Sequence, residues 1–588
     1  MSETDAMNLG GANARALTGL NPTTSVPSDK TGMENDANAS KEPEAAQGVA
    51  PEAAPAKPPR RRPAPSGVAE LHEAAPADVE IELKLVVDPD RLAEFNEAPI
   101  VAANARSKGS RKHFKTVYYD TPERKLRREG LSLRVRQSGT RFTQTVKAEC
   151  GDDPLTRGEW EASVPSAAPD VALAAPFIPA KLLAELERQP LEPVFTSDIH
   201  RHQRLVDLPS GMVEVAFDHG LLKAGERTLP VSEIELELKA GSAAAIYELA
   251  LQLAEHGPVR PSIQAKSERG FDLAEDMPPT APKPRKLRLD PSIPLDDAFT
   301  RILRACLHHL LQSLPAAADG RDPEGVHQLR VALRRLRSAL HLMRPVSSLS
   351  KLEMLRAEAK WLASSLTDAR EWDIFQSQTL PGIAKGCPSV TGFDALDEVA
   401  ARRRIAAYHK VRFVLADRRC AAFLLGLGAW IEARGWRSDI SSENLSELTE
   451  PAIAFAQRTL AAQYAKVLKR GRHLKSMDAE ERHRLRLAVK KLRYGTDFLL
   501  PLCGEGKAVK RFRDRLAELQ EELGSYNDMA TTVSLLSGLG METPDSRIAA
   551  AAIAGWQASS MMSTESRLRD AWRAFVKAKA PWEAEAEA

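Results

Sequence analysis

The 588-residue chain has few cysteines and no long apolar segment. Its five cysteines are scattered without CxxC spacing, which argues against a disulfide framework or a cysteine-based metal site and favours a reducing compartment. No run reaches the roughly 18 consecutive apolar residues of a membrane span. The first residues, MSETDAMNLGG, lack the basic and apolar parts of a secretory signal. We therefore expect a soluble, cytoplasmic protein with no membrane partner.

Aromatic residues make up only 5% of the chain, and the net charge of +2 hides a division between its two halves. Residues 291–588 carry 45 Lys and Arg against 36 Asp and Glu, whereas the first 290 residues carry 37 against 44. The basic stretches of the second half are not interleaved with aromatic side chains, which stack on bases in single-strand binding proteins. Nucleic acid is therefore not an expected partner.

Composition divides the chain into five segments. Residues 1–76 are rich in Ala, Pro, Ser and Gly and hold too few large apolar residues to offset chain entropy, which predicts a disordered tail. Period-two alternation predicts a strand-rich domain over 77–278, followed by a Pro-rich linker at 279–294. Amphipathic helical patterns occupy 295–580, and 581–588 form a short acidic tail. We expect a multidomain protein with two folded parts.

The first predicted strand, DVEIELKLVV, alternates charged and apolar residues, so Glu80, Glu82 and Lys84 share one face. Later strands also carry a charged face, and the two signs are sorted between strands. Acidic positions include Glu159, Glu161, Glu214, Asp218, Glu233, Glu235 and Glu237; basic positions include Arg134, Arg136, Lys147, Arg201, Arg204 and Lys266.

This sorting by sign favours a barrel with a polar interior over an ordinary solvated surface, where the signs would be mixed. Facing acidic strands would repel each other unless a cation lay between them. Carboxylates are hard ligands suited to Mg²⁺ or Mn²⁺, and the basic strands opposite would hold a polyanion. From the residues alone, a solvated charged face remains the alternative.

Several spaced motifs in this region resemble the CYTH superfamily, the triphosphate tunnel metalloenzymes. They are EIELK, YYDTPERKLRREGLSLRVR, TVKAE, RGEWE, FDHGLLKAG, SEIELELKAG and SIQAKSERGFDL, in the order of the family. The resemblance implies an α+β domain built on an eight-stranded antiparallel β-barrel, a tunnel that binds triphosphate with a divalent metal, Mg²⁺ or Mn²⁺.

Position by position, the resemblance also implies roles for individual residues. The implied metal ligands are Glu80, Glu82, Glu235 and Glu237. The implied substrate contacts are Lys84, Arg134, Arg136, Lys147, Arg201 and Lys266. The implied catalytic group comprises Glu80, Glu82, Lys84 and Asp218. Glu161, Glu233 and Lys239 are expected to be rim charges, and Tyr118 a packing residue.

The helical region contains one sequence twice: VHQLRVALRRLRSALHLM begins at Val326, and RHRLRLAVKKLRYGTDFL begins at Arg482. Helical spacing places a histidine and three basic residues on one stripe of each copy, with leucines opposite. The stripes are His327, Arg330, Arg334 and Arg337, then His483, Arg486, Lys490 and Arg493. A second echo pairs LTDAREWD with LGSYNDMA. Surface helices are often basic, but that alone does not explain the same stripe in both copies.

The paired stripe resembles the CHAD domain, a conserved-histidine helical domain often joined to CYTH domains. The resemblance implies an all-α, duplicated four-helix bundle around a basic cavity that binds inorganic polyphosphate. Together, the two resemblances imply a metal-dependent inorganic triphosphatase whose partners are inorganic triphosphate and long-chain polyphosphate. Two alternatives stay open: an adenylate cyclase of the CYTH type, and a polyphosphate-binding protein with little catalysis.

Overall fold

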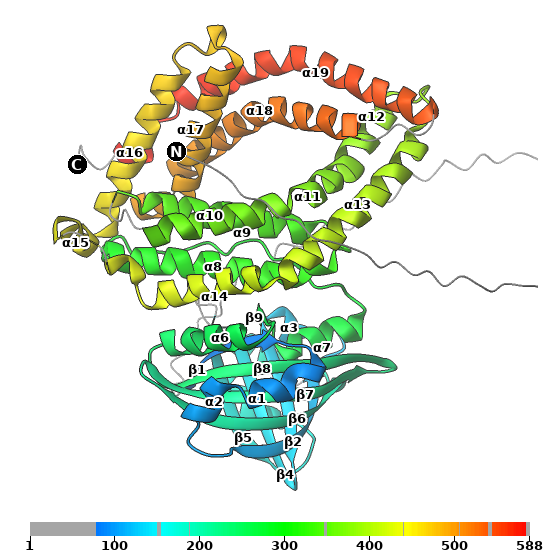
Figure 1. Ribbon diagram of the computed structural model, residues 1–588, viewed down its shortest axis with the longest axis vertical. Helices are drawn as coiled ribbons and strands as arrows, with labels where there is room; N and C mark the ends of the chain where they lie inside the picture. Colours follow the sequence, from blue (N-terminus) through cyan, green and yellow to red (C-terminus); the bar gives the residue numbers. More distant parts are fainter. Residues whose placement is uncertain are drawn as a thin grey trace, which may run out of the picture. The chain divides into compact units, whose positions relative to one another are not determined.

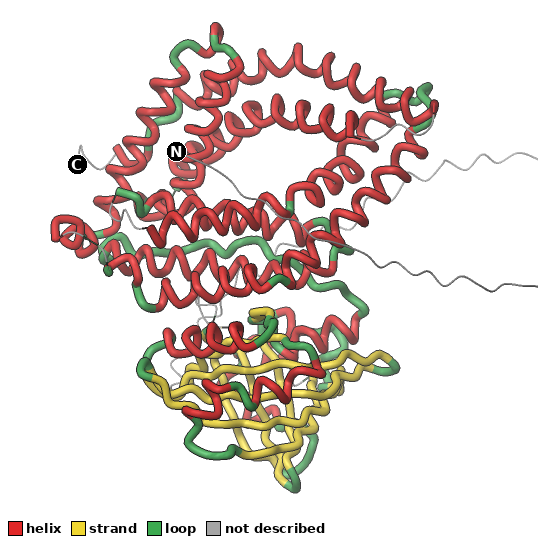
Figure 2. Tube along the Cα trace, viewed as in Figure 1, coloured by secondary structure: helices red, strands yellow, loops and turns green. Residues whose placement is uncertain are grey.

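We describe a computed structural model of the chain in eight segments: residues 78–149, 155–186, 188–345, 350–438, 440, 442–504, 506–538 and 544–583. The predicted disordered tail at 1–76 and most of the predicted acidic tail at 581–588 lie outside these segments. Within the described residues, every named strand precedes residue 263, and only helices follow (Figure 2).

The first folded part contains nine strands and seven α-helices among the described residues (Figure 1). The strands are β1 (Asp78–Val86), β2 (Ser110–Asp120), β3 (Leu131–Ser138), β4 (Arg141–Glu149), β5 (Thr156–Val164), β6 (Glu192–Leu208), β7 (Gly211–Ala224), β8 (Arg227–Gly241) and β9 (Arg260–Ser262). The helices are α1 (Leu92–Asn96), α2 (Pro99–Asn104), α3 (Lys125–Arg128), α4 (Val171–Ala174), α5 (Ala180–Leu186), α6 (Ala244–His256) and α7 (Lys266–Glu275).

All strand pairs in this part are antiparallel and form one sheet, in the order β5-β4-β3-β2-β6-β7-β8-β1-β9. Strand β1 also pairs with β5, from Asp78 opposite Glu159 to Ile81 opposite Thr156. The sheet therefore curves around until β5, the strand at one edge, pairs with β1, which lies next to the other edge. The ninth strand, β9, spans three residues beside β1 and is one more than the eight predicted.

Alternation within the strands separates an apolar face from a charged face. On β1, Leu83 and Leu85 are fully buried in the hydrophobic core. Helices α1 and α6 pack against β7 and β8 and cover that apolar face. We use "charged face" for the opposite side of the sheet, which carries Glu80, Glu82, Lys84 and the side chains that contact them.

The segment from 277 to 290, which overlaps the predicted linker at 279–294, contains no helix or strand. The second folded part then consists of helices. They are α8 (Leu295–Asp319), α9 (Glu324–Leu342), α10 (Ser350–Ser365), α11 (Thr367–Ile374), α12 (Leu380–Gly386), α13 (Phe393–Ala416), α14 (Arg418–Glu432), α15 (Ser442–Thr449), α16 (Ala452–Gly471), α17 (Ala479–Leu499), α18 (Lys507–Gly538) and α19 (Pro544–Val576).

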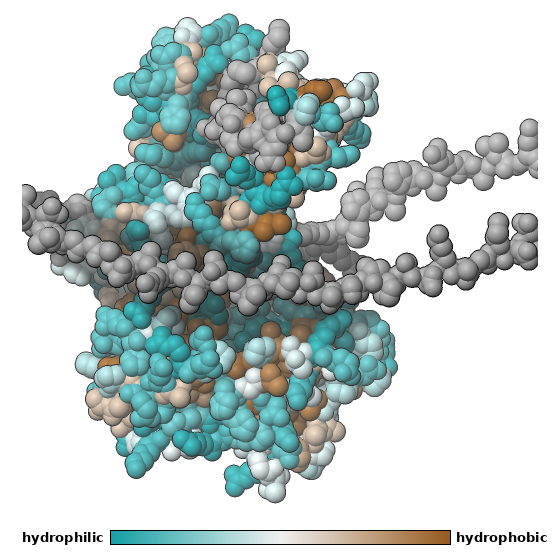
Figure 3. All heavy atoms as spheres, turned by 45° about the vertical axis from the view of Figure 1, so that its right-hand side comes forward, coloured by the Kyte–Doolittle hydropathy of each residue, from teal (hydrophilic) through white to brown (hydrophobic). Residues whose placement is uncertain are grey.

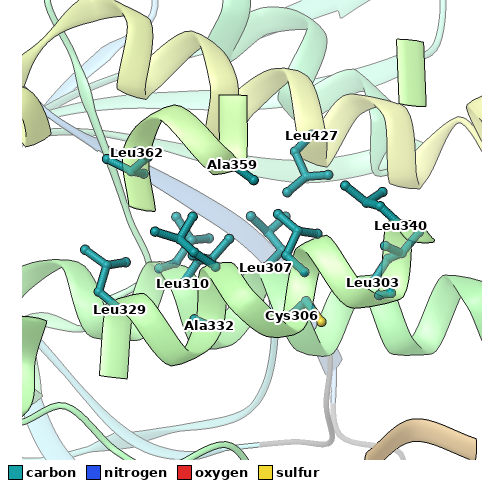
Figure 4. Packing of buried hydrophobic residues seen from close by; sticks show 14 of the residues in the cluster. Leu303, Cys306, Leu307, Leu310, Leu329, Ala332, Leu340, Ala359, Leu362 and Leu427 are labelled. Carbon is teal, nitrogen blue, oxygen red and sulfur yellow. The ribbon is translucent and has the colours of Figure 1, made fainter. Parts of the chain in front are cut away.

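The core of the helical part lies where α8 and α9 pack side by side and α10 and α14 add further apolar residues. Figure 4 shows Leu310 of α8 near Leu329 of α9, and Leu303 of α8 near Leu340 of α9. Cys306 lies in the same layer, and its burial raises the pKa of the thiol to about 11. This thiol is therefore a packing group. The four described cysteines are all free.

Helix boundaries in this part follow local chemistry. Helix α8 ends at Asp319 and is capped by Gly320, whose φ of 80° a residue with a Cβ rarely adopts. A Cβ there would also lie 2.4 Å from the Tyr408 ring. Helix α17 begins with a capping box, in which Asp478 accepts from the Glu481 backbone N–H and the Glu481 side chain accepts from Asp478.

The surface in view in Figure 3 is mainly hydrophilic, and its hydrophobic residues are scattered in small groups. Among the described residues, no helix is long and apolar enough to cross a bilayer.

Candidate functional site

Lysines and arginines pair with most of the carboxylates of the charged face. On β1, the Lys84 ammonium pairs with Glu82 and lies 3.8 Å from Glu235 of β8. The antiparallel register explains this contact, because it places Lys84 opposite Glu235 and Glu82 opposite Glu237. Lys84 is only 3% exposed, so its charge is directed into the protein and not into solvent.

A second group of contacts connects β1 with β3, β4 and β5. Lys147 of β4 donates to Glu80 at 2.6 Å and lies 3.1 Å from Glu159 of β5. Arg134 of β3 donates to the same Glu159 at 3.0 Å. Glu159 is therefore shared between two cations, which hold its pKa below the usual value despite burial.

A third group surrounds Asp218, which is fully buried on β7. Arg201 of β6 donates two hydrogen bonds of 2.7 Å to Asp218 and also contacts Glu235. Lys266, the first residue of α7, donates to Asp218 at 2.7 Å and to Glu235 at 2.8 Å, and it contacts Glu233. Burial alone would raise the pKa of Asp218, but these two cations hold it below its usual value.

The carboxylates of Asp218, Glu233 and Glu235 come close enough to hold a metal ion. The Lys266 ammonium already lies among them and balances part of their charge. Glu235, which the sequence groups with the metal ligands, contacts Lys266 and Arg201, and these cations hold its pKa well below the usual value against burial.

The other predicted ligands lie in an acid-rich region. Glu214 of β7, Glu237 of β8 and Glu82 of β1 form one cross-strand row, since Glu237 is opposite both of the others. Like charges directly opposite each other destabilise a sheet. Burial, Glu214 and Glu82 raise the pKa of Glu237 even though Lys239 pairs with it. Burial and then Glu82 raise the pKa of Glu80 to about 7.

Arg136 of β3 differs from the other predicted substrate contacts. It forms no ion pair with a carboxylate of the described residues, and its guanidinium lies 4.7 Å from the centre of the Phe114 ring. Burial, Arg134 and Arg201 lower its pKa to about 10. The charged face therefore contains repelling cations as well as repelling carboxylates.

The structure changes three expectations from the sequence. Glu233, expected at the rim, is 1% exposed and accepts from Arg269 at 2.5 Å. Arg204 does not lie on the charged face, because its side chain donates to the Asn96 carbonyl at the end of α1. Phe114, which lies under Arg136 and Arg201, was missed, although its period-two spacing from Tyr118 placed it on that face. Tyr118 packs on Phe195, with ring centres 4.3 Å apart, as expected.

On α9, the predicted stripe is a group of basic side chains that disfavour one another's charged forms. Arg330 donates to the Ala363 carbonyl at 2.5 Å and to Thr367 Oγ1 at 2.8 Å, which ties α9 to α10 and α11. Burial and then Arg370 lower the pKa of His327, and Arg334 and Arg330 act in the same direction. Arg370 belongs to the LTDAREWD echo, so both repeated motifs of this half meet at His327.

On α17 the equivalent stripe is more open, because His483 is exposed whereas His327 is half-buried. Helices α9 and α17 contact each other, and the buried Arg335 of α9 lies 5.1 Å from the centre of the Phe498 ring of α17. At Arg337, the last residue of the stripe on α9, burial and then the nearby Arg356 lower the pKa. Within the described residues the two stripes are thus on adjoining helices with several further basic groups nearby.

Residues 78–271 match the family model of the CYTH domain, and residues 301–537 match that of the CHAD domain. An inorganic triphosphatase of Haemophilus influenzae is 29% identical over 194 residues, which cover 33% of this chain and 54% of that protein. The chain thus spans about half the length of this relative. Protein MT2285 of Mycobacterium tuberculosis is 26% identical over 397 residues, 64% of this chain and 74% of that protein.

Among solved structures, the CHAD domain of the plant Ricinus communis is 29% identical and has a TM-score of 0.45. The match covers 51% of this chain and 98% of that domain. With the two family matches in the predicted order, the chain contains a CYTH domain followed by a CHAD domain.

Proposed function

We propose that the charged face is the wall of a triphosphate tunnel formed by β1 to β8, and that it hydrolyses a phosphoanhydride bond of inorganic triphosphate. The pairing of β1 with β5 supports the tunnel, with β9 as an added strand. The similarity to an inorganic triphosphatase supports the substrate.

The observation that carries this proposal is the crowding of like charges of each sign on one face. Glu214 and Glu82 both lie directly opposite Glu237, and Arg136, which forms no ion pair with a described carboxylate, is repelled by Arg134 and Arg201. A triphosphate bound with a divalent metal supplies the opposing charges together: the metal neutralises carboxylates, and the phosphates neutralise guanidinium groups.

The acid-rich region fits a hard divalent cation, because its donors are carboxylate oxygens. Glu80, Glu82 and Glu237 would hold Mg²⁺ or Mn²⁺, with Glu235 at the edge of the set. The metal, when bound, would neutralise phosphate oxygens and make phosphorus a better target for attack. Arg134, Arg136 and Lys147 would stabilise the charge that spreads over the phosphoryl oxygens in the transition state. Asp218 would position Arg201 and Lys266, since it accepts from both.

For the helical domain, we propose that α9 and α17 are equivalent helices of two repeated halves, whose stripes bind long-chain polyphosphate. The repulsion among His327, Arg330, Arg334 and Arg370 supports this, because a polyanion relieves it. Such binding should weaken strongly with added salt, since screening acts on ionic contacts.

Phosphate release from a substrate panel tests the catalytic proposal. The full chain is incubated with triphosphate, thiamine triphosphate, ATP and long-chain polyphosphate, with Mg²⁺, Mn²⁺ or EDTA. We expect triphosphate to be the best substrate and EDTA to abolish release. Formation of cyclic AMP from ATP would favour a cyclase instead, and polyphosphate binding without any phosphate release would favour a binding protein.

A further inference from the structure

Three histidines form a row across the sheet on the side opposite the charged face. His113 of β2 is paired with His200 of β6, which in turn is paired with His219 of β7. Their sequence neighbours Arg201 and Asp218 belong to the charged face, and successive residues of a strand point to opposite faces. The row is therefore separate from the site described above.

The side chains of this row are close together. The rings of His113 and His200 are stacked, with centroids 4.2 Å apart and an interplanar angle of 3°. The His219 ring lies 5.2 Å from that of His200. Asp198 precedes His200 by two positions and shares its face, and Nε2 of His113 hydrogen-bonds to Asp198 Oδ1 at 2.5 Å. This hydrogen bond is the main reason why the pKa of Asp198 is below its usual value.

We propose that His113, Asp198 and His200 form a binding site for a transition-metal dication such as Zn²⁺. One ligand atom from each of the three residues lies within 4.8 Å of the other two. Ligands about 2.0–2.1 Å from a tetrahedral Zn²⁺ are roughly 3.4 Å apart, so small side-chain rotations would close the site.

The donor set decides which metal fits. Two imidazoles and one carboxylate suit Zn²⁺, Cu²⁺, Ni²⁺ or Fe²⁺, whereas Mg²⁺ and Mn²⁺ prefer oxygen ligands. The site would therefore select a different metal from the one proposed for the carboxylates of the charged face. His113 and Asp198 have side chains 42% and 40% exposed, so the ion could be reached from solvent and would keep open positions for water.

A metal here would join β2 to β6 at a functionally sensitive place. His200 is adjacent to Arg201, whose guanidinium contacts Asp218 and Glu235 on the other face. Occupation of the site would thus restrain the strand segment that positions Arg201. The nearby Lys115 is a cation on the same face, and Asp198 supplies the negative charge that offsets it.

The test uses the metal-free full chain with Zn²⁺ in a calorimetric titration and Cu²⁺ in electron paramagnetic resonance, which detects coupling to imidazole nitrogen. The variants are His113→Ala, Asp198→Asn and His200→Ala, with His409→Ala as a matched loss of an exposed imidazole from α13. We expect one nitrogen-coordinated equivalent in the wild type and in His409→Ala. Each of the three variants that removes a proposed metal ligand should bind Zn²⁺ at least about tenfold more weakly. Even the loss of a residue that only hydrogen-bonds to a metal ligand lowers metal affinity by that factor.

Thermal unfolding in EDTA and in Zn²⁺ separates metal binding from loss of fold. Binding to the folded chain alone raises the midpoint, so Zn²⁺ should stabilise the wild type and not the double variant His113→Ala/His200→Ala. Unchanged nitrogen coupling in the double variant would overturn the proposal. So would a wild type that binds no Zn²⁺, or an equal loss of binding in His409→Ala.

Discussion

The Lys266 ammonium lies 2.7 Å from the Asp218 carboxylate, although the two residues are 48 positions apart in the sequence. Lys266 begins α7, and Asp218 lies in the middle of β7. The contact joins a helix to the centre of the charged face and brings one cation to three carboxylates. The charge of Asp218, Glu233 and Glu235 is therefore balanced in part by Lys266, a residue outside the strands.

Replacing Lys266 should be costly for both stability and activity. Lys266→Met would leave Asp218, Glu233 and Glu235 without their shared cation, and removing one partner of a buried ion pair typically costs about 3–5 kcal/mol. We expect a loss of this order in the free energy of unfolding in urea and at least about tenfold slower triphosphate hydrolysis. The control is Lys239→Met, which removes an exposed ion pair with Glu237 and should cost no more than about 1 kcal/mol. Equal effects in both variants would contradict the prediction.

Replacing Arg136 should have the opposite effect: triphosphate hydrolysis should change more than stability. Its guanidinium has no carboxylate partner among the described residues and is repelled by Arg134 and Arg201. Arg136→Gln should therefore unfold at the same urea concentration as the wild type or a higher one. Loss of a charge-assisted contact removes roughly 1.5–3 kcal/mol, so kcat/KM for triphosphate should fall at least about tenfold. Arg227→Gln, at an exposed position, is the control. Wild-type kinetics in Arg136→Gln would show that this side chain does not contact substrate.

The raised pKa of Glu80 predicts how stability depends on pH without metal. The folded chain keeps a proton on Glu80 up to about pH 7, whereas the unfolded chain releases it near the ordinary value of 4.5. Stability from this group is therefore fully present below pH 4.5 and falls as the pH rises to about 7. Glu80→Gln should be more stable than the wild type at pH 8 in EDTA, with little difference near pH 4.5, and should lose metal-dependent hydrolysis. Urea unfolding at both pH values measures this; a difference that is constant with pH would contradict it.

The helical stripe separates residues that only bind from residues that also support the fold. Arg330 ties α9 to neighbouring helices through Ala363 and Thr367, whereas the Arg334 guanidinium makes no hydrogen bond or ion pair with described residues. We expect Arg334→Ala to weaken polyphosphate binding without lowering the unfolding temperature, and Arg330→Ala to lower both. Fluorescence titration with long-chain polyphosphate at two salt concentrations, together with thermal unfolding, checks this.

The quadruple variant His327→Ala/Arg330→Ala/His483→Ala/Arg486→Ala extends the test to both stripes. It should lose most polyphosphate binding while triphosphate hydrolysis persists. Binding that ignores all four changes would place the polyanion on another surface.

Much of this arrangement could be predicted from the sequence because alternation is a local property. The spacing of Glu80, Glu82 and Lys84 predicts their common face without knowledge of any other strand, and the structure agrees. The stripe on α9 follows in the same way from helical periodicity. The family matches then agree with the two domains predicted from these motifs.

What could not be predicted depends on contacts between distant segments. The burial of Glu233 requires Lys266 and Arg269 of α7, which no strand pattern indicates. The row of His113, His200 and His219 exists only because β2, β6 and β7 pair in one particular register. β9 spans three residues, which is too short for any periodicity to be visible.

The pairing of β1 with strands made much later has a consequence for how the protein is made. One partner of this strand, β8, does not end until Gly241, so β1 leaves the ribosome long before that partner exists. At synthesis rates of about 5–20 residues per second, the delay is roughly 8–30 s. During this time residues 82–86 of β1 lack the strand that they pair with and form an open strand edge, the kind of segment that recruits other chains. The charges of Glu80, Glu82 and Lys84 oppose such association, so the same residues that we place in the site also protect the nascent chain from aggregation.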